Sequence, residues 1–210
     1  MIIVHGRATS SNVQNVMWCA AELGLEVERR DVGGAFGGTD TPEYLAMNPN
    51  RTVPTVEIDG TVLWESGAVV RCLAAMHGDE TFWPRDPLVR ARLDMWAEWG
   101  RATLAPKFQP FFLQLIFRKP GDADQAVLAA ARPPLEGALA VLDAHLANSP
   151  FIGEAFSFAD ILPGVLMYRL HELALTPRDF PNVTRWYRDL AARPAYAEHA
   201  MVSFASLRPK

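Results

Sequence analysis

The sequence predicts an α/β domain followed by an all-helical domain, and three observations carry this prediction. Short apolar runs of strand type alternate with helical periodicity up to residue 77. Two of these runs are separated only by Asp59-Gly60, a strong signal for a two-residue hairpin turn. After Pro87 the strand signals vanish, and apolar residues recur at helical spacing. We therefore expect an α/β domain over 1–77, a connector over 78–87 and a helical domain over 88–210.

The first part of the α/β domain reads as a strand, a helix and a second strand. Ile2-Ile3-Val4 is a continuous apolar run, typical of a strand that is buried on both faces. Polar residues 9–12 then precede a helical pattern that Gly24 ends. Residues 25–32 alternate in part and predict the second strand. A crossover of this kind makes the two strands parallel.

Residues 41–77 complete the domain. Thr41 is expected to cap a short helix that opens with Pro42. The hairpin strands follow over 55–58 and 61–64, and a helix begins near Ser66, which we expect as its N-cap. Strand–helix–strand, a short helix, then strand–strand–helix is the order of a thioredoxin fold.

Two long helical patterns open the second domain. Residues 90–117 are rich in aromatic side chains, and Pro106 and Pro110 should kink or interrupt this helix. Residues 123–147 predict another helix, with a break or bend at Pro133-Pro134.

The C-terminal part contains a capping signal. Ser157 and Asp160 have the spacing of a capping box, and they precede an apolar run that extends to Leu173. We assign this pair to stability. Shorter helices are expected over 180–192 and 194–201.

Composition excludes several functions. The net charge is −4 with both signs interspersed, so we expect neither nucleic acid nor a membrane surface as a partner. No apolar run approaches the roughly 20 residues of a membrane span, and the start lacks the layout of a signal peptide. The two cysteines and five histidines show no metal-ligand spacing, so no metal is expected. We expect a cytoplasmic protein.

The hairpin region carries a family resemblance. Val53-Pro54-Thr55-Val56, Asp59-Gly60 and the stretch from Trp64 to Arg71 resemble the glutathione-binding half of cytosolic glutathione transferases. The resemblance extends over essentially the whole chain and is closest to bacterial serine-type members, theta-like or nu-like. It implies a glutathione S-transferase that uses glutathione as co-substrate and adds its thiolate to a hydrophobic electrophile, as in detoxification.

The resemblance also implies how glutathione binds. Residue chemistry alone gives an X-Pro bond a cis fraction of about 5–6%, whereas the family has a cis bond before the residue that corresponds to Pro54. The main chain of Val53 would then pair with the cysteinyl unit of glutathione, and Glu65 and Ser66 would hold its γ-glutamyl end. Arg51 is either a ligand of the glycyl carboxylate or a solvated surface arginine. Phe36, in the loop from Gly33 to Gly38, could lean over the peptide.

The polar residues before the first helix are the catalytic candidates. Ser10, Ser11 and Asn12 could simply cap the helix, or they could form an anion site with its unpartnered N–H groups. In the second case a glutathione thiol placed there ionises more easily. When positions are counted back from the end of the helix, the resemblance favours Ser10 first, Asn12 second and Ser11 third.

The electrophile would lie between the two domains in this family. Most aromatic residues of the long helix are expected to be buried in the core, but the upper part of that helix could line an apolar cleft. The candidates are Trp99, Thr103, Phe108, Phe111 and Phe112.

The resemblance implies a homodimer, in which Asp94 of a partner could complete the γ-glutamyl site. Alternatives are a glutathione-dependent isomerase, dehalogenase or peroxidase, and an inactive transferase-like binding module.

Overall fold

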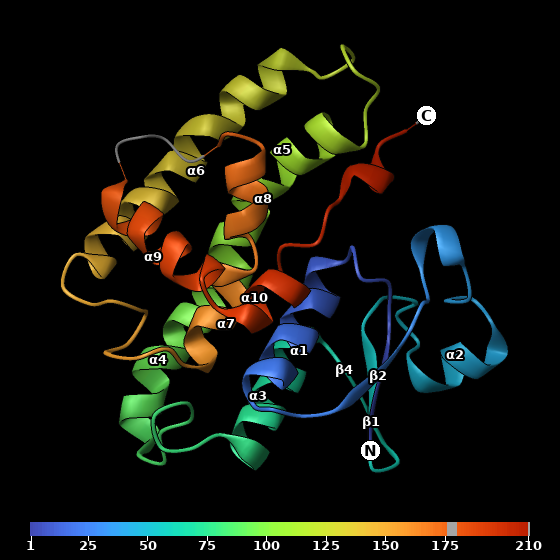
Figure 1. Ribbon diagram of the computed structural model, residues 1–210. Coiled ribbons are helices and arrows are strands. Elements are labelled where there is room, and N and C mark those ends of the chain that lie inside the picture. Colours follow the sequence, from blue (N-terminus) through green and yellow to red (C-terminus); the bar gives the residue numbers. More distant parts are fainter. Residues whose placement is uncertain (176–179, 210) are drawn as a thin grey trace.

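The computed structural model describes residues 1–175 and 180–209, which fold into two domains packed side by side (Figure 1). Within these residues the strands all belong to the first domain, and the second is helical, as the sequence predicts. The strands are β1 (Ile2–His5), β2 (Val27–Arg30), β3 (Thr55–Ile58) and β4 (Thr61–Trp64).

The four strands form one mixed sheet in the order β2-β1-β3-β4. β1 pairs in parallel with β2 and antiparallel with β3, and β3 pairs antiparallel with β4. All four residues of β1 are buried, consistent with its continuous apolar run. Asp59 (φ 48°) and Gly60 (φ 85°) both have positive φ, as a two-residue hairpin turn of type I′ requires.

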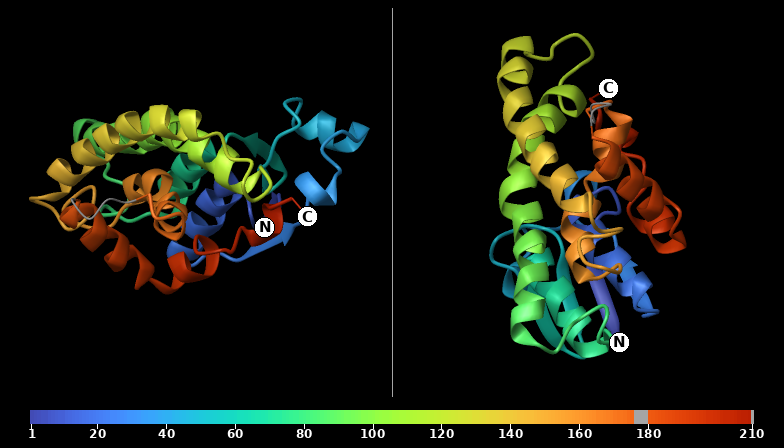
Figure 2. Two further views of the ribbon diagram at one scale, coloured as in Figure 1. Left: turned by 90° about the horizontal axis from the view of Figure 1, so that it is seen from above. Right: turned by 90° about the vertical axis from the view of Figure 1, so that its left-hand side faces the viewer.

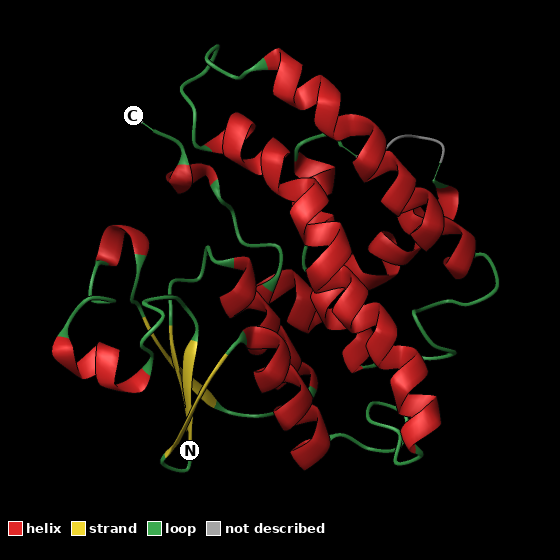
Figure 3. Cartoon of the chain, turned by 180° about the vertical axis from the view of Figure 1, so that it is seen from behind, coloured by secondary structure: helices red, strands yellow, loops and turns green. Residues whose placement is uncertain are grey.

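Helices cover the sheet. The helices α1 (Ser11–Glu22) and α3 (Ser66–His77) pack against each other on the side that faces the helical domain. The short α2 (Pro42–Met47) lies on the far side of the sheet from that domain (Figures 1 and 3). Thr41 caps α2 as predicted, since its hydroxyl accepts the N–H of Tyr44. A single 3₁₀ turn, η1 (Gly34–Phe36), occupies the glycine-rich loop.

The first long helix of the second domain is interrupted. It consists of α4 (Pro87–Trp99), a π-helical segment η2 (Gly100–Leu104) and α5 (Ala105–Ile116). Pro106 lies in the first turn of α5, where the missing N–H of proline is tolerated, and the wide π turn directly before it removes the clash with the preceding carbonyls. Pro110 lies inside α5 without ending it. The expected interruption therefore occurs, but at the first proline alone.

The sequence predicts a break or bend at Pro133-Pro134, and the prediction of a break is wrong. Both prolines lie inside one continuous helix, α6 (Gln125–Leu146), which runs beside α5 (Figure 2). The two carbonyls that lose their hydrogen bonds belong to Ala129 and Ala130, which are exposed. Water can satisfy them there, so the helix continues.

The C-terminal part supplies the rest of the helical core. It contains α7 (Phe158–Gly164), α8 (Met167–Glu172), α9 (Pro181–Ala191), α10 (Pro194–His199) and the 3₁₀ turn η3 (Ala205–Leu207). The predicted capping box is present at the start of α7. The Asp160 carboxylate is fully buried and accepts hydrogen bonds from the N–H groups of Ser157 (3.0 Å) and Ile152 (2.9 Å) and from the indole of Trp186 (2.9 Å).

An ion pair joins the two domains. Arg193, at the start of α10, makes a two-pronged ion pair with Glu22 at the end of α1, with distances of 2.8 and 2.6 Å. Its guanidinium also lies over the ring of Phe156. Across the described residues, no helix has both the length and the apolar character needed to cross a membrane.

Candidate active site

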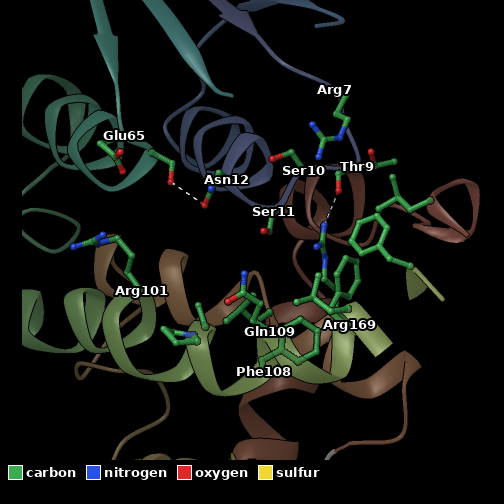
Figure 4. Close-up of a pocket in the computed structure, with 18 residues that line it drawn as sticks. Arg7, Thr9, Ser10, Ser11, Asn12, Glu65, Arg101, Phe108, Gln109 and Arg169 are labelled. Atoms are coloured by element: carbon green, nitrogen blue, oxygen red, sulfur yellow. Dashed lines mark hydrogen bonds between the residues drawn. The ribbon is translucent and has the colours of Figure 1, made fainter. Parts of the chain in front are cut away.

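A cavity of about 450 Å³ lies between the two domains, at the start of α1 (Figure 4). Its floor is the first turn of α1 and the start of α3, and its opposite wall is α5 with parts of α8 and η3. The α/β domain contributes mainly polar side chains, whereas the helical domain contributes most of the apolar ones. The residues that line it include Ser10, Ser11, Asn12, Glu65, Ser66, Arg101, Phe108, Gln109, Phe112, Leu113, Leu166 and Arg169, together with Arg7.

The three catalytic candidates all line this cavity. Ser10 is the N-cap residue of α1 by backbone geometry, but its side chain makes no capping hydrogen bond. In the part of the chain that the structure describes, the N–H groups of Ser11, Asn12 and Val13 also have no hydrogen-bond acceptor. The Ser10 hydroxyl therefore does not cap the helix. The end of α1 instead presents a free hydroxyl and unpartnered amides, an arrangement that favours a negatively charged atom.

A chain of polar side chains connects α1 with α3. The side chain of Asn15 donates to the Ser66 hydroxyl, and that hydroxyl donates to Oδ1 of Asn12, each over 3.4 Å. Asn15 and Ser66 are buried, whereas Asn12 is exposed at the cavity. Since Oδ1 of Asn12 accepts from Ser66, its amide nitrogen remains as a donor toward the cavity.

Glu65 turns the chain sharply between β4 and α3. It has φ 66° and ψ 105°, a conformation that costs a non-glycine residue about 1–3 kcal/mol and that recurs at ligand sites. It is also the N-cap residue of α3, so the expectation that Ser66 is the cap is wrong: Ser66 is the first helical residue. Among the described residues the N–H groups of Ser66 and Gly67 have no acceptor. A carboxylate and two free amides thus converge at this end of the cavity.

The segment before β3 is held by side chains of α2 and of the loop that follows. The bond between Val53 and Pro54 is cis. The Thr52 carbonyl accepts from the Tyr44 hydroxyl (2.6 Å) and from Asn48 (3.1 Å). Within the described ranges, the N–H and C=O groups of Val53 make no hydrogen bond. This stretch therefore holds unpaired main-chain groups in a fixed position, and neither Val53 nor Pro54 belongs to the cavity lining.

Arg51 and Phe36 lie outside the cavity. Arg51 is exposed and has φ 58°, and the side chain of Phe36 is 60% exposed. Neither belongs to the cavity lining, so the structure does not bring them together with the residues at the start of α1.

The aromatic candidates divide into two sets. Phe108 and Phe112 line the cavity, with ring centroids 5.7 Å apart. Phe111 is buried against α6 and borders a separate cavity. Trp99 and Thr103 do not line the cavity either; Trp99 packs on Trp96 at 5.3 Å. The structure therefore places two of the five at the predicted position.

Sequence reasoning missed the three arginines of the cavity, of which Arg101 lies on η2. Arg7 comes from the loop after β1 and Arg169 from α8. Arg169 is 4% exposed, and burial, with a smaller contribution from the charge of Arg7, lowers the pKa of its guanidinium to about 10. The sequence does contain a signal for Arg169, which is the one Lys or Arg within the apolar run from Ser157 to Leu173. Charged side chains are rarely buried unless they have a partner or a function.

Neither cysteine lines the cavity, and Asp94 does not line it either. Cys19 is fully buried, and this burial raises the pKa of its thiol far above the ordinary value. Asp94 accepts a hydrogen bond of 2.7 Å from Arg71 of the same chain. In the described residues no group of three or more His, Cys, Asp and Glu side chains is arranged to hold a metal ion.

Comparison with known families matches both halves of the chain. Residues 9–76 match the glutathione S-transferase N-terminal domain, and residues 96–194 match the glutathione S-transferase C-terminal domain. A glutathione S-transferase of Escherichia coli, GstB, is 36% identical over 205 residues, which cover 96% of this chain and 99% of the relative. Glutathione S-transferase 4 of Zea mays is 30% identical over 91% of this chain and 88% of the relative.

Solved structures agree with these matches. The theta-class glutathione S-transferase of Xanthomonas axonopodis pv. citri with glutathione bound superposes with a TM-score of 0.91 at 39% identity, covering 96% of this chain and 98% of that one. A delta-class enzyme of Nilaparvata lugens gives a TM-score of 0.88 at 26% identity, with 99% of this chain and 98% of that chain covered. The similarity therefore includes both domains.

Proposed function

The chain belongs to the glutathione S-transferase family, and from this premise we propose that the cavity at the start of α1 binds glutathione and ionises its thiol. The protein is a glutathione transferase, an enzyme that uses glutathione as co-substrate. The finer assignment of residues to steps is our proposal. It rests on one observation above all: the free Ser10 hydroxyl and the unpartnered amides at the start of α1.

These donors are sufficient to ionise a thiol. Lowering the pKa of a thiol by about two units from roughly 8.5 requires about 2.7 kcal/mol. A hydrogen bond to a charged sulfur contributes about 1.5–3 kcal/mol, and a helix N-terminus adds about 0.3–1 kcal/mol. We assign the hydroxyl donor to Ser10, with Asn12 second and Ser11 third. The proton can leave to water through the open cavity, so no general base is required.

The same geometry supports proposed positions for the rest of glutathione. The Glu65 carboxylate suits the ligand's α-amino group, and the free N–H groups of Ser66 and Gly67 suit its α-carboxylate. Because the Ser66 hydroxyl already donates to Asn12, its amide is the better donor. The unpaired main chain of Val53 would bind the cysteinyl unit, and Arg51 remains our candidate for the glycyl carboxylate.

The electrophile would occupy the half of the cavity formed by the helical domain. Phe108 and Phe112 supply its apolar wall. The thiolate attacks the electrophilic carbon, a C–S bond forms, and the leaving group departs with the bonding electrons. We propose detoxification of such electrophiles in the cytoplasm as the setting.

We also propose that the enzyme is a homodimer. Large apolar side chains are exposed on β4, α3 and α4, namely Trp64 (41%), Met76 (53%), Leu88 (75%), Val89 (49%) and Met95 (63%). A second copy would cover them. Sedimentation equilibrium tests this: a single species of monomer mass at micromolar concentration would contradict it.

Calorimetric titration with glutathione tests the proposed site. The wild-type chain should bind glutathione with millimolar or better affinity, and Glu65→Ala should abolish this binding at the same concentrations. Glu43→Ala is a matched control, since that exposed carboxylate lies on α2, outside the cavity. Absence of wild-type binding at about 10 mM, which corresponds to roughly −2.7 kcal/mol, would contradict the proposal.

A further inference from the structure

Two arginines of the cavity have no anionic partner. Neither Arg7 nor Arg169 forms an ion pair with any carboxylate that the structure describes. The Nε atoms of both are buried and lack a hydrogen-bond acceptor. Arg101 also lines the cavity but differs, because Glu98 accepts from it at 2.6 Å. The charge of Arg7 and Arg169 is therefore left uncompensated.

Arg169 is held in place by contacts that leave most of its donors free. Its Nη2 atom donates to the Thr9 carbonyl (2.7 Å) and to the Gln14 side chain (3.2 Å). Its guanidinium lies over the ring of Phe112, 4.8 Å from the centroid. Arg7 makes no side-chain hydrogen bond with the described residues. Burying the charge of Arg169 without an anion is costly, and the half-buried Arg7 adds a second unpaired charge to the same cavity, so a purely structural role leaves the pair unexplained.

The arginines lie at the end of the cavity away from Glu65. Figure 4 shows Glu65 on one side, Arg7 and Arg169 on the other, and Ser10 and Ser11 between them. If glutathione has its amino end at Glu65 and its sulfur at Ser10, the arginines face the region beyond the sulfur. That region borders Phe112, on the electrophile's side of the cavity.

We propose that Arg7 and Arg169 bind a carboxylate on the electrophile, so that the preferred second substrate is an anion with an apolar body. The inference rests on the proposed function. Arginine donors fit a carboxylate well, and the rings of Phe108 and Phe112 would contact the apolar part. Binding there would hold the reacting carbon over the thiolate at Ser10.

A matched pair of aryl chlorides tests this preference. 4-Chloro-3-nitrobenzoate and its carboxamide differ in charge and hardly in shape. In both, the thiolate sulfur attacks the ring carbon that carries chlorine; the C–Cl bond breaks, chloride leaves with the electron pair, and the thiol proton goes to solvent. We expect kcat/KM, divided by the uncatalysed rate constant, to favour the benzoate by about tenfold or more.

Variants of the two arginines test whether these side chains cause the preference for the benzoate. Arg7→Met should remove most of it while the KM for glutathione, measured with the carboxamide, stays the same. Arg188→Met is the charge-matched control, because that side chain is 75% exposed on α9, and it should leave the preference intact. Arg169→Met should act as Arg7→Met does. Should it fail to fold, inhibition of the wild type replaces it: 4-nitrobenzoate should compete with the electrophile and inhibit more strongly than 4-nitrobenzamide.

Three outcomes separate this inference from the function on which it rests. Equal normalised rates for the two chlorides would overturn the inference and leave the transferase function standing. A raised KM for glutathione in Arg7→Met, with the preference unchanged, would place a carboxylate of glutathione at the arginines and also overturn it. No turnover of either chloride together with no glutathione binding would overturn the proposed function itself.

Discussion

The Ser66 hydroxyl donates to Oδ1 of Asn12 over 3.4 Å and so links the first turn of α3 to the first turn of α1. The two helices carry the two ends of the proposed glutathione site. Because Asn15 donates in turn to Ser66, the hydroxyl is oriented from behind by a buried side chain. The orientation of the Asn12 amide toward the proposed sulfur position therefore depends on Ser66, which we propose binds the other end of glutathione.

The first prediction concerns Ser66→Ala. Loss of the hydroxyl frees the Asn12 amide and should lower kcat by about two- to tenfold, the equivalent of one neutral hydrogen bond. The KM for glutathione should change less, since the main-chain N–H of Ser66 is retained. Steady-state kinetics with varied glutathione measure both values. An unchanged kcat with a large rise in KM would show that Ser66 acts on binding alone.

The fold was largely predictable from local signals. The hairpin turn at Asp59-Gly60, the proline-led helix after Thr41 and the capping box at Ser157 each have a local physical cause, and all three are present. The prolines of the long helices were harder. Whether Pro133 breaks a helix depends on whether the carbonyls it deprives of a partner face water, which the local sequence does not reveal.

On both sides of the cavity the sequence predicted some of the lining residues and missed others. Ser10 and Glu65 stand next to helix starts, so their position follows from neighbours in the chain. Arg169 is about 160 residues from the loop it contacts, and its placement depends on how the two domains pack. Phe111 and Phe112 differ by one position on the same helix, and only packing decides which of them faces the cavity.

A second prediction concerns Asp160→Asn. The carboxylate accepts three hydrogen bonds, and an amide nitrogen would face the Ser157 N–H, so one acceptor is lost. Unfolding in urea at pH 7 should show a loss of about 1–3 kcal/mol. A variant as stable as the wild type would contradict the structural role of this carboxylate.

The same variant should change the pH dependence of stability. Burial raises the pKa of Asp160 to about 6, above the value of about 3.9 for an unfolded chain. Between these values the folded state holds a proton that the unfolded state lacks, so the free energy of unfolding increases as pH falls from 6 to 4. The stability difference between wild type and Asp160→Asn should be about 1 kcal/mol larger at pH 5 than at pH 7. A difference that shrinks on acidification would contradict this.

A third prediction uses a pair of helical glycines. A Cβ atom at Gly100 would lie 2.7 Å from the main-chain nitrogen of Pro163, so η2 and α7 could not keep their present contact. We expect Gly100→Ala to lower the free energy of unfolding by about 1–3 kcal/mol. Gly137 is exposed in the middle of α6 with nothing near its Cβ position, and Gly137→Ala should stabilise by about 0.5–1 kcal/mol. Thermal unfolding of both variants checks the contrast, which equal effects would contradict.

The pKa of the thiol of bound glutathione tests the central claim most directly. It can be measured by titrating the ultraviolet absorbance of the thiolate in the binary complex. We predict a pKa about two units below the ordinary value of roughly 8.5 for the wild type, and a value close to 8.5 for Ser10→Ala with glutathione still bound. A wild-type complex in which the thiol keeps its ordinary pKa would contradict ionisation at the start of α1.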